Sequence, residues 1–232
     1  MTGQLLKRAV VLASGGLDST VAAAVARQAG YELYLLTLAY QQRHAVEIER
    51  AKQVACALEA AHHLVVPVDL QSIGGSALTG DLPVPKDRRD SDRGRDVPVT
   101  YVPGRNLIFL SIAAAQAEVV GASVIYFGAN VVDYSGYPDC RPEFIKAVET
   151  TLQLGTKLGM MGGRIEIRAP LLQMTKAEII RLGLDLGAPI QLTHSCYDPT
   201  DTVACGRCDS CLIRRRGFAE VGVVDPIPYA VS

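Results

Sequence analysis

The segment SGGLDS, which spans Ser14 to Ser19, combines two glycines with hydroxyl groups and one carboxylate. It follows a β-branched apolar run and leads into an alanine-rich amphipathic pattern. A strand that turns through glycines into a helix gathers backbone N–H groups and the positive helix end around one small volume. Glycine also lets an anion approach the backbone where a Cβ would block it. The pattern indicates a phosphate site, although such turns also contain glycines for purely structural reasons.

Asp18 stands out in this turn because a carboxylate repels phosphate. A bound Mg²⁺ would reverse the sign of that interaction, so we assign Asp18 to a metal or hydroxyl contact. The competing interpretation is that Asp18 caps the helix N-terminus. The turn matches neither G-x-x-x-x-G-K-[ST] nor G-x-G-x-x-G, which argues against the kinase-type and dinucleotide-binding loops.

Four cysteines follow a C-x8-C-x2-C-x2-C spacing, and they are Cys196, Cys205, Cys208 and Cys211. Sulfurs at this spacing can converge on a tetrahedral ion, and four thiolates leave no open coordination position. The pattern predicts structural zinc, with an iron–sulfur cluster or unliganded thiols as alternatives. Of the other two cysteines, Cys56 falls in a helical apolar pattern and is interpreted as a core residue. Cys140 lies in a polar segment, where it either packs or is reactive.

The elements that must position these groups alternate along the chain. Apolar runs at 8–13, 32–40, 63–70 and 123–130 predict strands, and helical patterns begin near Ser19 and cover 45–60 and 106–121. Continuous apolar strands between helices indicate a parallel sheet covered on both faces, an α/β doubly wound core. Thr175 and Glu178 are spaced as a capping box, with Gly187 as a stop, which predicts one more helix. Lys176 at its start is either ordinary structure or a phosphate contact.

Three segments interrupt the alternation. Residues 71–105 are rich in Gly, Pro and charges of alternating sign, and they form either a functional lid or a solvated, partly disordered loop. Residues 130–144 are polar and turn-rich, and the third segment is the cysteine-rich tail. We divide the chain into a nucleotide-binding domain over 1–190 and a zinc-binding segment over 191–232.

The composition excludes several classes of function. The 232 residues are 49% hydrophobic, enough for a full core, and the formal net charge of −1 gives no sign of a polyanion-binding surface. Arg214 to Arg216 form a short basic run, read as a solvated face or carboxylate partners rather than a nucleic-acid patch. The apolar run before the glycines is too short for a signal peptide or a membrane span, which predicts a cytoplasmic protein.

The motifs together resemble a known family. SGGLDS resembles the pyrophosphate loop of the N-type ATP pyrophosphatases, which include GMP synthetase, NAD synthetase and tRNA-thiolating enzymes. With YVPGRN, DYSGYPDCRPEF and the cysteine cluster, the chain from Val10 to Phe218 is similar to the 7-cyano-7-deazaguanine synthases of the queuosine pathway. The resemblance implies an adenine nucleotide alpha hydrolase-like fold and a homodimer. It also implies an ATP-dependent reaction that turns 7-carboxy-7-deazaguanine and ammonia into the nitrile, with release of AMP and pyrophosphate.

The resemblance also implies roles for particular residues. Asp18 and Ser19 take the catalytic positions, with Mg²⁺ neutralising developing charge. The expected ATP site comprises Ala13, Ser14, Gly15, Gly16, Leu17, Asp18, Ser19, Thr20, Arg105 and Asn106. Arg105 and Asn106 would contact a phosphate or a carboxylate, unless they serve only in capping and surface pairing.

The expected site for the deazaguanine comprises Asp133, Tyr134, Tyr137, Asp139 and Arg141. The two carboxylates can accept hydrogen bonds from the donor-rich edge of the base, a tyrosine can stack on it, and Arg141 offers a planar fork for its carboxylate. The chain leaves no room for a glutaminase domain, so free ammonium or an outside donor supplies the nitrogen. Another adenylating enzyme, such as a tRNA thiolase, and a non-enzymatic zinc-ribbon regulator that binds nucleic acid are the alternatives.

Overall fold

The computed structural model describes residues 7–40, 46–89, 96–133 and 136–230. Its strands are β1 (Arg8–Leu12), β2 (Glu32–Ala39), β3 (His62–Pro67), β4 (Val124–Tyr126) and β5 (Glu166–Arg168). Its α-helices are α1 (Leu17–Gln28), α2 (Val46–Ala57), α3 (Arg105–Val120), α4 (Pro142–Gly155), α5 (Lys157–Met160), α6 (Lys176–Asp185) and α7 (Asp209–Val221). Two short 3-10 helices are η2 (Pro138–Cys140) and η3 (Ile190–Leu192).

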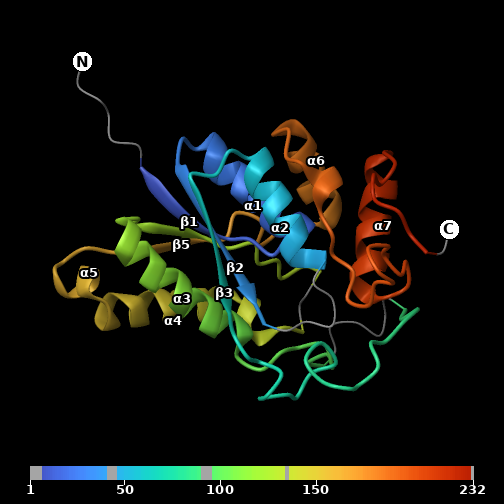
Figure 1. Ribbon diagram of the computed structural model, residues 1–232, viewed down its shortest axis with the longest axis horizontal. Coiled ribbons are helices and arrows are strands. Elements are labelled where there is room, and N and C mark those ends of the chain that lie inside the picture. The colour runs from blue at the N-terminus through green and yellow to red at the C-terminus, as the bar shows by residue number, and fades with distance from the viewer. Residues whose placement is uncertain (1–6, 41–45, 90–95, 134–135, 231–232) are drawn as a thin grey trace.

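The strands form one parallel sheet in the order β3-β2-β1-β4-β5. Ala9 and Val11 of β1 face one apolar cluster, whereas Val10 and Leu12 face the other, and all four are buried. Helices α1, α2 and α6 cover the first face, and α3 and α4 cover the second (Figure 1). The predicted doubly wound α/β core is therefore confirmed. From β1 the strand order continues through β2 and β3 on one side and through β4 and β5 on the other, so it reverses at β1. In an open parallel sheet the ligand crevice lies at the carboxyl ends of the strands where the order reverses, so we expect one at the end of β1.

Most of the predicted elements appear close to their expected bounds. The first helix begins at Leu17, two residues before the expected start, and α6 carries the predicted capping box between Thr175 and Glu178. Strand β5 was not predicted because only three residues of RIEIRAP are extended, too few for an alternating pattern to be recognised.

The interpretation of Cys56 as a core residue is wrong, because its side chain is exposed. The buried positions of α2 are Ala51, Val54 and Ala55, and they form a stripe that ends beside Leu58. Cys56 lies outside this stripe on the helix, so an apolar residue in a helical pattern need not face the core.

The segment 71–105 is solvated only in part where the structure describes it. Ala77, Leu78, Val84 and Val102 are buried in a third apolar cluster together with the four clustered cysteines. The neighbouring charges pair with the cysteine-rich segment: Lys86 with Asp198 at 2.9 Å, Asp87 with Arg207, and Arg88 with Asp209 at 3.0 Å. In the sequence, charges of alternating sign suggest a solvated loop, but here each of these three charges pairs with an opposite charge in the cysteine-rich segment. Residues 90–95 lie outside the described part.

The division at residue 190 stays a prediction. Phe218 of α7 packs in the same apolar cluster as Leu17 and Val21 of α1, and α7 lies against α6. Figure 1 shows α7 beside α6.

Candidate active site

The turn between β1 and α1 depends on Gly15. Gly15 has φ +77°, and a Cβ on it would lie 2.4 Å from the carbonyl oxygen of Glu47 and 2.8 Å from the backbone nitrogen of Ala51. Gly16, at φ −85°, needs no left-handed conformation, although a Cβ there would lie 3.2 Å from the hydroxyl of Ser14. The first glycine is therefore required by both conformation and space, because α2 packs directly on it.

Hydroxyl groups hold the turn in shape. Ser19 Oγ donates to the carbonyl of Gly16 at 3.1 Å and accepts the backbone N–H of Ser14 at 3.1 Å. Its single proton is thereby used, so Ser14 Oγ is the donor in the 3.0 Å contact between the two hydroxyls. Ser14 Oγ also accepts the N–H of Gly16 at 3.2 Å. The two serines thus occupy backbone donors that an anion could take.

The beginning of α1 is supported by a residue from the far end of the chain. Gly16 is the N-cap and no side chain of its own segment caps the helix, so the interpretation of Asp18 as the N-cap is wrong. Instead, the N–H of Leu17 donates to Ser195 Oγ at 3.3 Å, and the N–H of His194 donates to the carbonyl of Gly15 at 2.8 Å.

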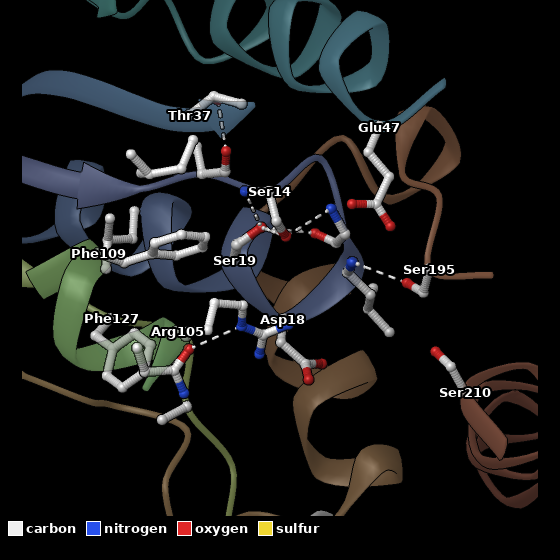
Figure 2. A pocket seen from close by; sticks show the side chains of 18 of the residues that line it. Ser14, Asp18, Ser19, Thr37, Glu47, Arg105, Phe109, Phe127, Ser195 and Ser210 are labelled. Carbon is white, nitrogen blue, oxygen red and sulfur yellow. Dashed lines mark hydrogen bonds between the residues drawn. The ribbon is translucent and has the colours of Figure 1, made fainter. Parts of the chain in front are cut away.

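The turn opens into a cavity of about 470 Å³ at the carboxyl end of β1 and β2 (Figure 2). Of the expected ATP-site residues, the cavity is lined by Ala13, Ser14, Gly16, Leu17, Asp18, Ser19, Arg105 and Asn106. Gly15 packs behind the turn, and the buried Oγ1 of Thr20 has no partner among the described residues. The structure therefore brings most of the predicted ATP site together, and Gly15 and Thr20 support it from behind.

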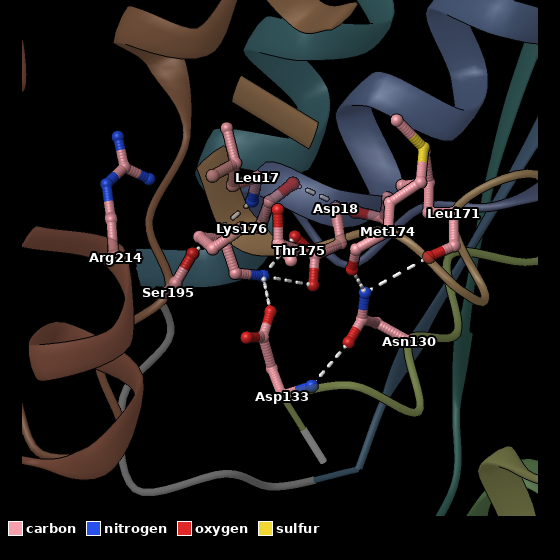
Figure 3. A network of polar contacts seen from close by, with 12 residues as sticks. Leu17, Asp18, Asn130, Asp133, Leu171, Met174, Thr175, Lys176, Ser195 and Arg214 are labelled. Atoms are coloured by element: carbon pink, nitrogen blue, oxygen red, sulfur yellow. Dashed lines mark hydrogen bonds and ion pairs between the residues drawn. The ribbon is translucent and has the colours of Figure 1, made fainter. Parts of the chain in front are cut away.

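Asp18 belongs to a charged network that joins three segments (Figure 3). Lys176 Nζ lies 2.6 Å and 2.8 Å from the two carboxylate oxygens of Asp18 and 3.3 Å from Oδ2 of Asp133. Asn130 orients this corner, because its Oδ1 accepts the N–H of Asp133 at 2.7 Å and its Nδ2 donates to the carbonyl of Leu171 at 3.0 Å. Burial raises the pKa of Asp133, and Lys176 offsets this only in part.

A second group of side chains forms the aromatic end of the cavity. Arg105 Nε donates to Asn106 Oδ1 at 3.2 Å, and Asn106 is fixed to Asp139 by its N–H and by its side-chain amide, each at 3.1 Å. Tyr137 lines the cavity, and its hydroxyl is 2.7 Å from Thr100 Oγ1. Burial raises the pKa of Asp139, and the N–H of Asn106 partly offsets the rise. Asn106 does not cap α3, whose N-cap is Gly104; its contacts with Asp139 instead tie α3 to η2.

The residues expected to bind the base are not all brought to the cavity. Tyr137 lines it, and Asp133 reaches it through Lys176. Asp139 is buried behind Asn106, and Arg141 is exposed at the N-cap of α4. Tyr134 lies outside the described residues. The fork predicted for Arg141 is exposed at the start of α4 and does not line the cavity.

Several residues of the cavity were missed in the sequence. They include Thr37, Tyr40, Phe109, Phe127, His194, Ser195, Tyr197, Ser210 and Arg214. Tyr40 and Thr37 could have been found, because the carboxyl end of the strand beside β1 borders the crevice in this type of sheet. Ser195 precedes the first clustered cysteine, yet nothing in the sequence places that position beside residue 17.

The four cysteines lie together, with their sulfur atoms within 4.8 Å of one another and all four side chains buried. Cys196 Sγ accepts the N–H of Cys205 at 3.2 Å, and Cys205 Sγ accepts the N–H of Cys208 at 3.3 Å. Such N–H donors stabilise metal-bound thiolates, so the geometry fits a closed tetrahedral ion. Cys140 packs in the apolar core beside the cavity, and burial raises the pKa of its thiol to about 12, which favours the packing role over the reactive one.

The basic run after the cysteines is paired. Arg214 is buried and donates to both oxygens of Asp225, at 2.8 Å and 3.0 Å. Arg216 lies 3.7 Å from Glu220, and the guanidinium of Arg215 stacks 5.3 Å from the ring centre of Tyr229. These contacts support the interpretation as carboxylate partners rather than a nucleic-acid patch.

None of the helices in the described ranges has the length and apolar character needed to cross a bilayer.

Two solved structures share the fold. A predicted tRNA methyltransferase subunit from Methanocaldococcus jannaschii has a TM-score of 0.51 at 16% identity, covering 97% of this chain and 94% of that one. A 4-thiouridine synthetase, solved with RNA and bound ATP, has a TM-score of 0.51 at 21% identity, covering 93% of this chain and 50% of that one. At these identities the likeness shows the fold alone, and it confirms the expected adenine nucleotide alpha hydrolase-like arrangement.

Sequence relatives are much closer. A 7-cyano-7-deazaguanine synthase from Myxococcus xanthus (strain DK1622) is 55% identical over 229 residues, covering 98% of this chain and all of the relative. Another, from Geotalea daltonii, is 58% identical over 227 residues, covering 97% of each chain. The model of the family described as queuosine biosynthesis protein QueC matches residues 8–222. That match spans the turn from Ser14 to Ser19, called the phosphate turn below, together with the cavity and all four clustered cysteines. The chain therefore belongs to the queuosine biosynthesis protein QueC family.

Proposed function

We propose that the protein converts 7-carboxy-7-deazaguanine and ammonia into 7-cyano-7-deazaguanine at the expense of ATP. The observation that carries the proposal is the glycine turn at the carboxyl end of the central strand, which opens into a cavity with an aromatic end. Nested backbone donors suit the phosphates of ATP, and the aromatic end suits a flat heterocycle. The curated relatives that bear this activity in their names support the choice of reaction.

The reaction needs activation because a carboxylate is a poor acyl donor. Attack of the carboxylate oxygen on the α-phosphorus of ATP forms an acyl-adenylate and releases pyrophosphate. Ammonia then adds to the acyl carbon, AMP leaves, and an amide remains. A second ATP adenylates the amide oxygen and releases a second pyrophosphate, and loss of AMP and of both amide protons yields the nitrile. One phosphate site can serve both adenylations, which suits a mechanism based on positioning and electrostatics.

In this proposal the phosphate turn binds the pyrophosphate portion of ATP. Ser14 and Ser19 turn their hydroxyls from the backbone donors they now satisfy toward phosphate oxygens, which releases the N–H groups of the turn. Lys176 adds a positive charge at this end of the cavity, held by Asp18 and Asp133. Asp18 would also be the ligand for Mg²⁺, which would neutralise charge on the phosphates.

The deazaguanine would occupy the aromatic end of the cavity. Tyr137 is one of the aromatic residues that line the cavity, and it is the one assigned here to stack on the base. Asp133 reaches the cavity through Lys176, and Asp139 acts through Asn106. Tyr134 keeps its proposed role from the sequence alone.

Zinc is the ion we propose for the cysteine cluster, because four buried thiolates at tetrahedral spacing match its preference. Its chemistry there would be structural, since four protein ligands leave no open position. We further propose a cytoplasmic homodimer supplied with free ammonium or by an outside donor, on the family resemblance alone.

The competing function as a tRNA thiolase would need a sulfur-carrying cysteine at the site. Among the described residues, Cys140 is the cysteine that lines the cavity. Its pKa of about 12 keeps it protonated near neutral pH, which makes it unsuited to carry sulfur.

A turnover assay with mass detection tests the function. The protein is incubated with Mg-ATP, ammonium and 7-carboxy-7-deazaguanine, and AMP is quantified beside the deazaguanine products. We expect nitrile and AMP, and a loss of at least about 100-fold in rate for Asp18→Ala, because Lys176 loses its closest carboxylate and the phosphate end loses its acidic group. Arg164→Gln, a change of an exposed side chain that does not line the cavity, should leave the rate unchanged.

Two results would contradict the proposal. Folded, zinc-loaded wild type that forms neither AMP nor nitrile would remove the substrate assignment. Formation of the nitrile by Asp18→Ala at the wild-type rate would remove the role given to the phosphate turn.

A further inference from the structure

Three cationic side chains line the cavity, and they differ in how their charges are balanced. Lys176 contacts two carboxylates, those of Asp18 and Asp133. Arg214 is paired with Asp225 through two hydrogen bonds. Arg105 has no carboxylate within ion-pair distance in the described ranges, since its hydrogen bonds go to an amide oxygen and a phenol, and Asp139 stabilises its charge only over a longer distance. Removing a cation from bulk water without an adjacent counter-ion costs free energy. An anionic ligand beside Arg105 would offset that cost.

The guanidinium of Arg105 is held in place with most of its donors free for a ligand. Nε donates to Asn106 Oδ1 at 3.2 Å, and Nη1 makes a long contact of 3.4 Å with the hydroxyl of Tyr40. Asn106 is itself fixed by two bonds to Asp139, so the position of the fork is defined by buried groups. Burial raises the pKa of Tyr40 to about 12, which keeps the phenol neutral and unable to serve as the counter-charge. Of the five N–H donors of an arginine, three remain for a bound anion.

The surroundings of Arg105 indicate which anion it binds. The guanidinium carbon lies 6.0 Å from the ring centre of Tyr40 and 5.9 Å from that of Phe109, and these two rings are 5.4 Å apart. The backbone donors of the phosphate turn belong instead to the beginning of α1. Figure 2 shows Arg105 projecting from α3 into the same cavity as the side chains of the turn. The cavity thus has one anion site built of amides and hydroxyls and a second built of a planar fork among aromatic rings.

We propose that Arg105 binds the carboxylate of the planar heteroaromatic acid that is the substrate, and that it does not bind the phosphates of ATP. This inference rests on the proposed function, and of the two ligands that the sequence left open for Arg105, a phosphate and a carboxylate, it selects the carboxylate. A fork of parallel N–H donors matches the two oxygens of a carboxylate, and the flanking rings exclude water from the pair. Arg105 therefore selects the acid for the first adenylation, whereas the uncharged amide formed from it does not need this residue.

The test compares three substrates in one set of variants. For Arg105→Gln and Arg105→Lys, the KM is measured for the acid, for ATP, and for the corresponding amide supplied in place of the acid. We expect the KM for the acid to rise on the order of 10- to 100-fold in Arg105→Gln, because a charge-assisted bidentate pair is lost. The KM values for ATP and for the amide should change by less than about threefold. Arg105→Lys, which keeps the charge but loses the fork, should fall between the wild type and Arg105→Gln.

Arg141→Gln is the competing variant, because Arg141 is the fork that the sequence indicates and the structure leaves exposed. Arg164→Gln provides a surface control for loss of one arginine. Thermal unfolding of each variant checks that the fold is intact. If Arg105→Gln does not fold, the comparison of acid and amide is made with Arg105→Lys.

Three outcomes would overturn the inference. The KM for ATP could rise as much as that for the acid, which would place a phosphate at Arg105. The KM for the amide could rise equally, which would mean that Arg105 contacts the ring system. Arg141→Gln rather than Arg105→Gln could raise the KM for the acid. Absence of turnover by the wild type would instead reject the proposed function, and this inference with it, so the two failures are distinguishable.

Discussion

Gly15 carries two separate constraints, one on its backbone and one on the space around it. Its φ of +77° lies in the left-handed region, and the nearest atoms to a Cβ there are backbone atoms of α2, which cannot move aside. Gly30 has nearly the same conformation, φ +80°, with nothing within 4 Å of a Cβ. The pair separates the conformational effect of a glycine from its steric effect.

Replacing each glycine by alanine should reveal that difference. Gly30→Ala should lower the free energy of unfolding by about 1–2 kcal/mol, the effect of a left-handed alanine. Gly15→Ala should lower it further and also weaken ATP binding at least about tenfold, because the turn must shift away from Glu47. Urea unfolding and ATP titration measure the two effects. Equal destabilisation by the two substitutions would show that contact with α2 is unimportant.

Asp133 should give the stability of the protein a specific dependence on pH. Burial raises the pKa of Asp133 in the folded state above the ordinary value of 3.8. Between that value and the raised one, the folded state binds more protons than the unfolded state, so this carboxyl lowers stability as pH rises. The free energy of unfolding of the wild type, minus that of Asp133→Asn, should therefore fall as pH rises from about 4 and become constant above the raised pKa.

Chemical denaturation at matched metal content measures this difference at each pH. A difference that rises with pH would mean that Lys176 outweighs burial and that the direction of the pKa shift is wrong.

At the level of elements, the cysteine-rich segment contacts the phosphate turn on one side and residues 86–88 on the other. Ser195 and the backbone of His194 contact the phosphate turn immediately before the first clustered cysteine. On the other side, residues 86–88 pair with charges within the same segment. An ion bound to the cysteines would thus hold in place Ser195 and His194, which contact the turn proposed to bind the nucleotide.

Removal of the metal should therefore weaken ATP binding. Protein stripped with a chelator and dialysed should bind Mg-ATP at least about tenfold more weakly than the loaded protein, and added zinc should restore the affinity. Ser195→Ala should lower the affinity with metal content unchanged, whereas Thr202→Ala, an exposed hydroxyl in the same segment, should not. Calorimetric titration gives both affinities. Equal affinity in metal-free, folded protein would show that the two sites are independent.

The predictability of these elements depended on the length of their patterns. Strands β1 and β2 have long apolar runs and α6 has a capping box, so all three were predicted, whereas the three-residue β5 was not. The charges of residues 86–88 alternate as a solvated loop does, and their partners lie more than a hundred positions away. Local pattern could not reveal pairing at that distance.

Considered as a whole molecule, the site assembles residues from most of the chain. The phosphate turn was recognisable because its glycines and hydroxyls are consecutive, and the cysteine cluster because its spacing is short. The sequence identified Arg105 and Lys176 as candidate ligand contacts but not the side chains that hold them, because those contacts depend on how α3 and α6 pack against the sheet. Arg141 was chosen for its chemistry alone, and the backbone at the start of α4 turns it to the surface.

The contact between Leu17 and Ser195 joins positions 178 residues apart. During synthesis at roughly 5–20 residues per second, the phosphate turn leaves the ribosome on the order of 10–35 seconds before the segment that completes it. A nascent chain can therefore form β1, β2 and β3 long before it has a finished nucleotide site. The contribution of Ser195 to the proposed nucleotide site is therefore absent during the early steps of folding.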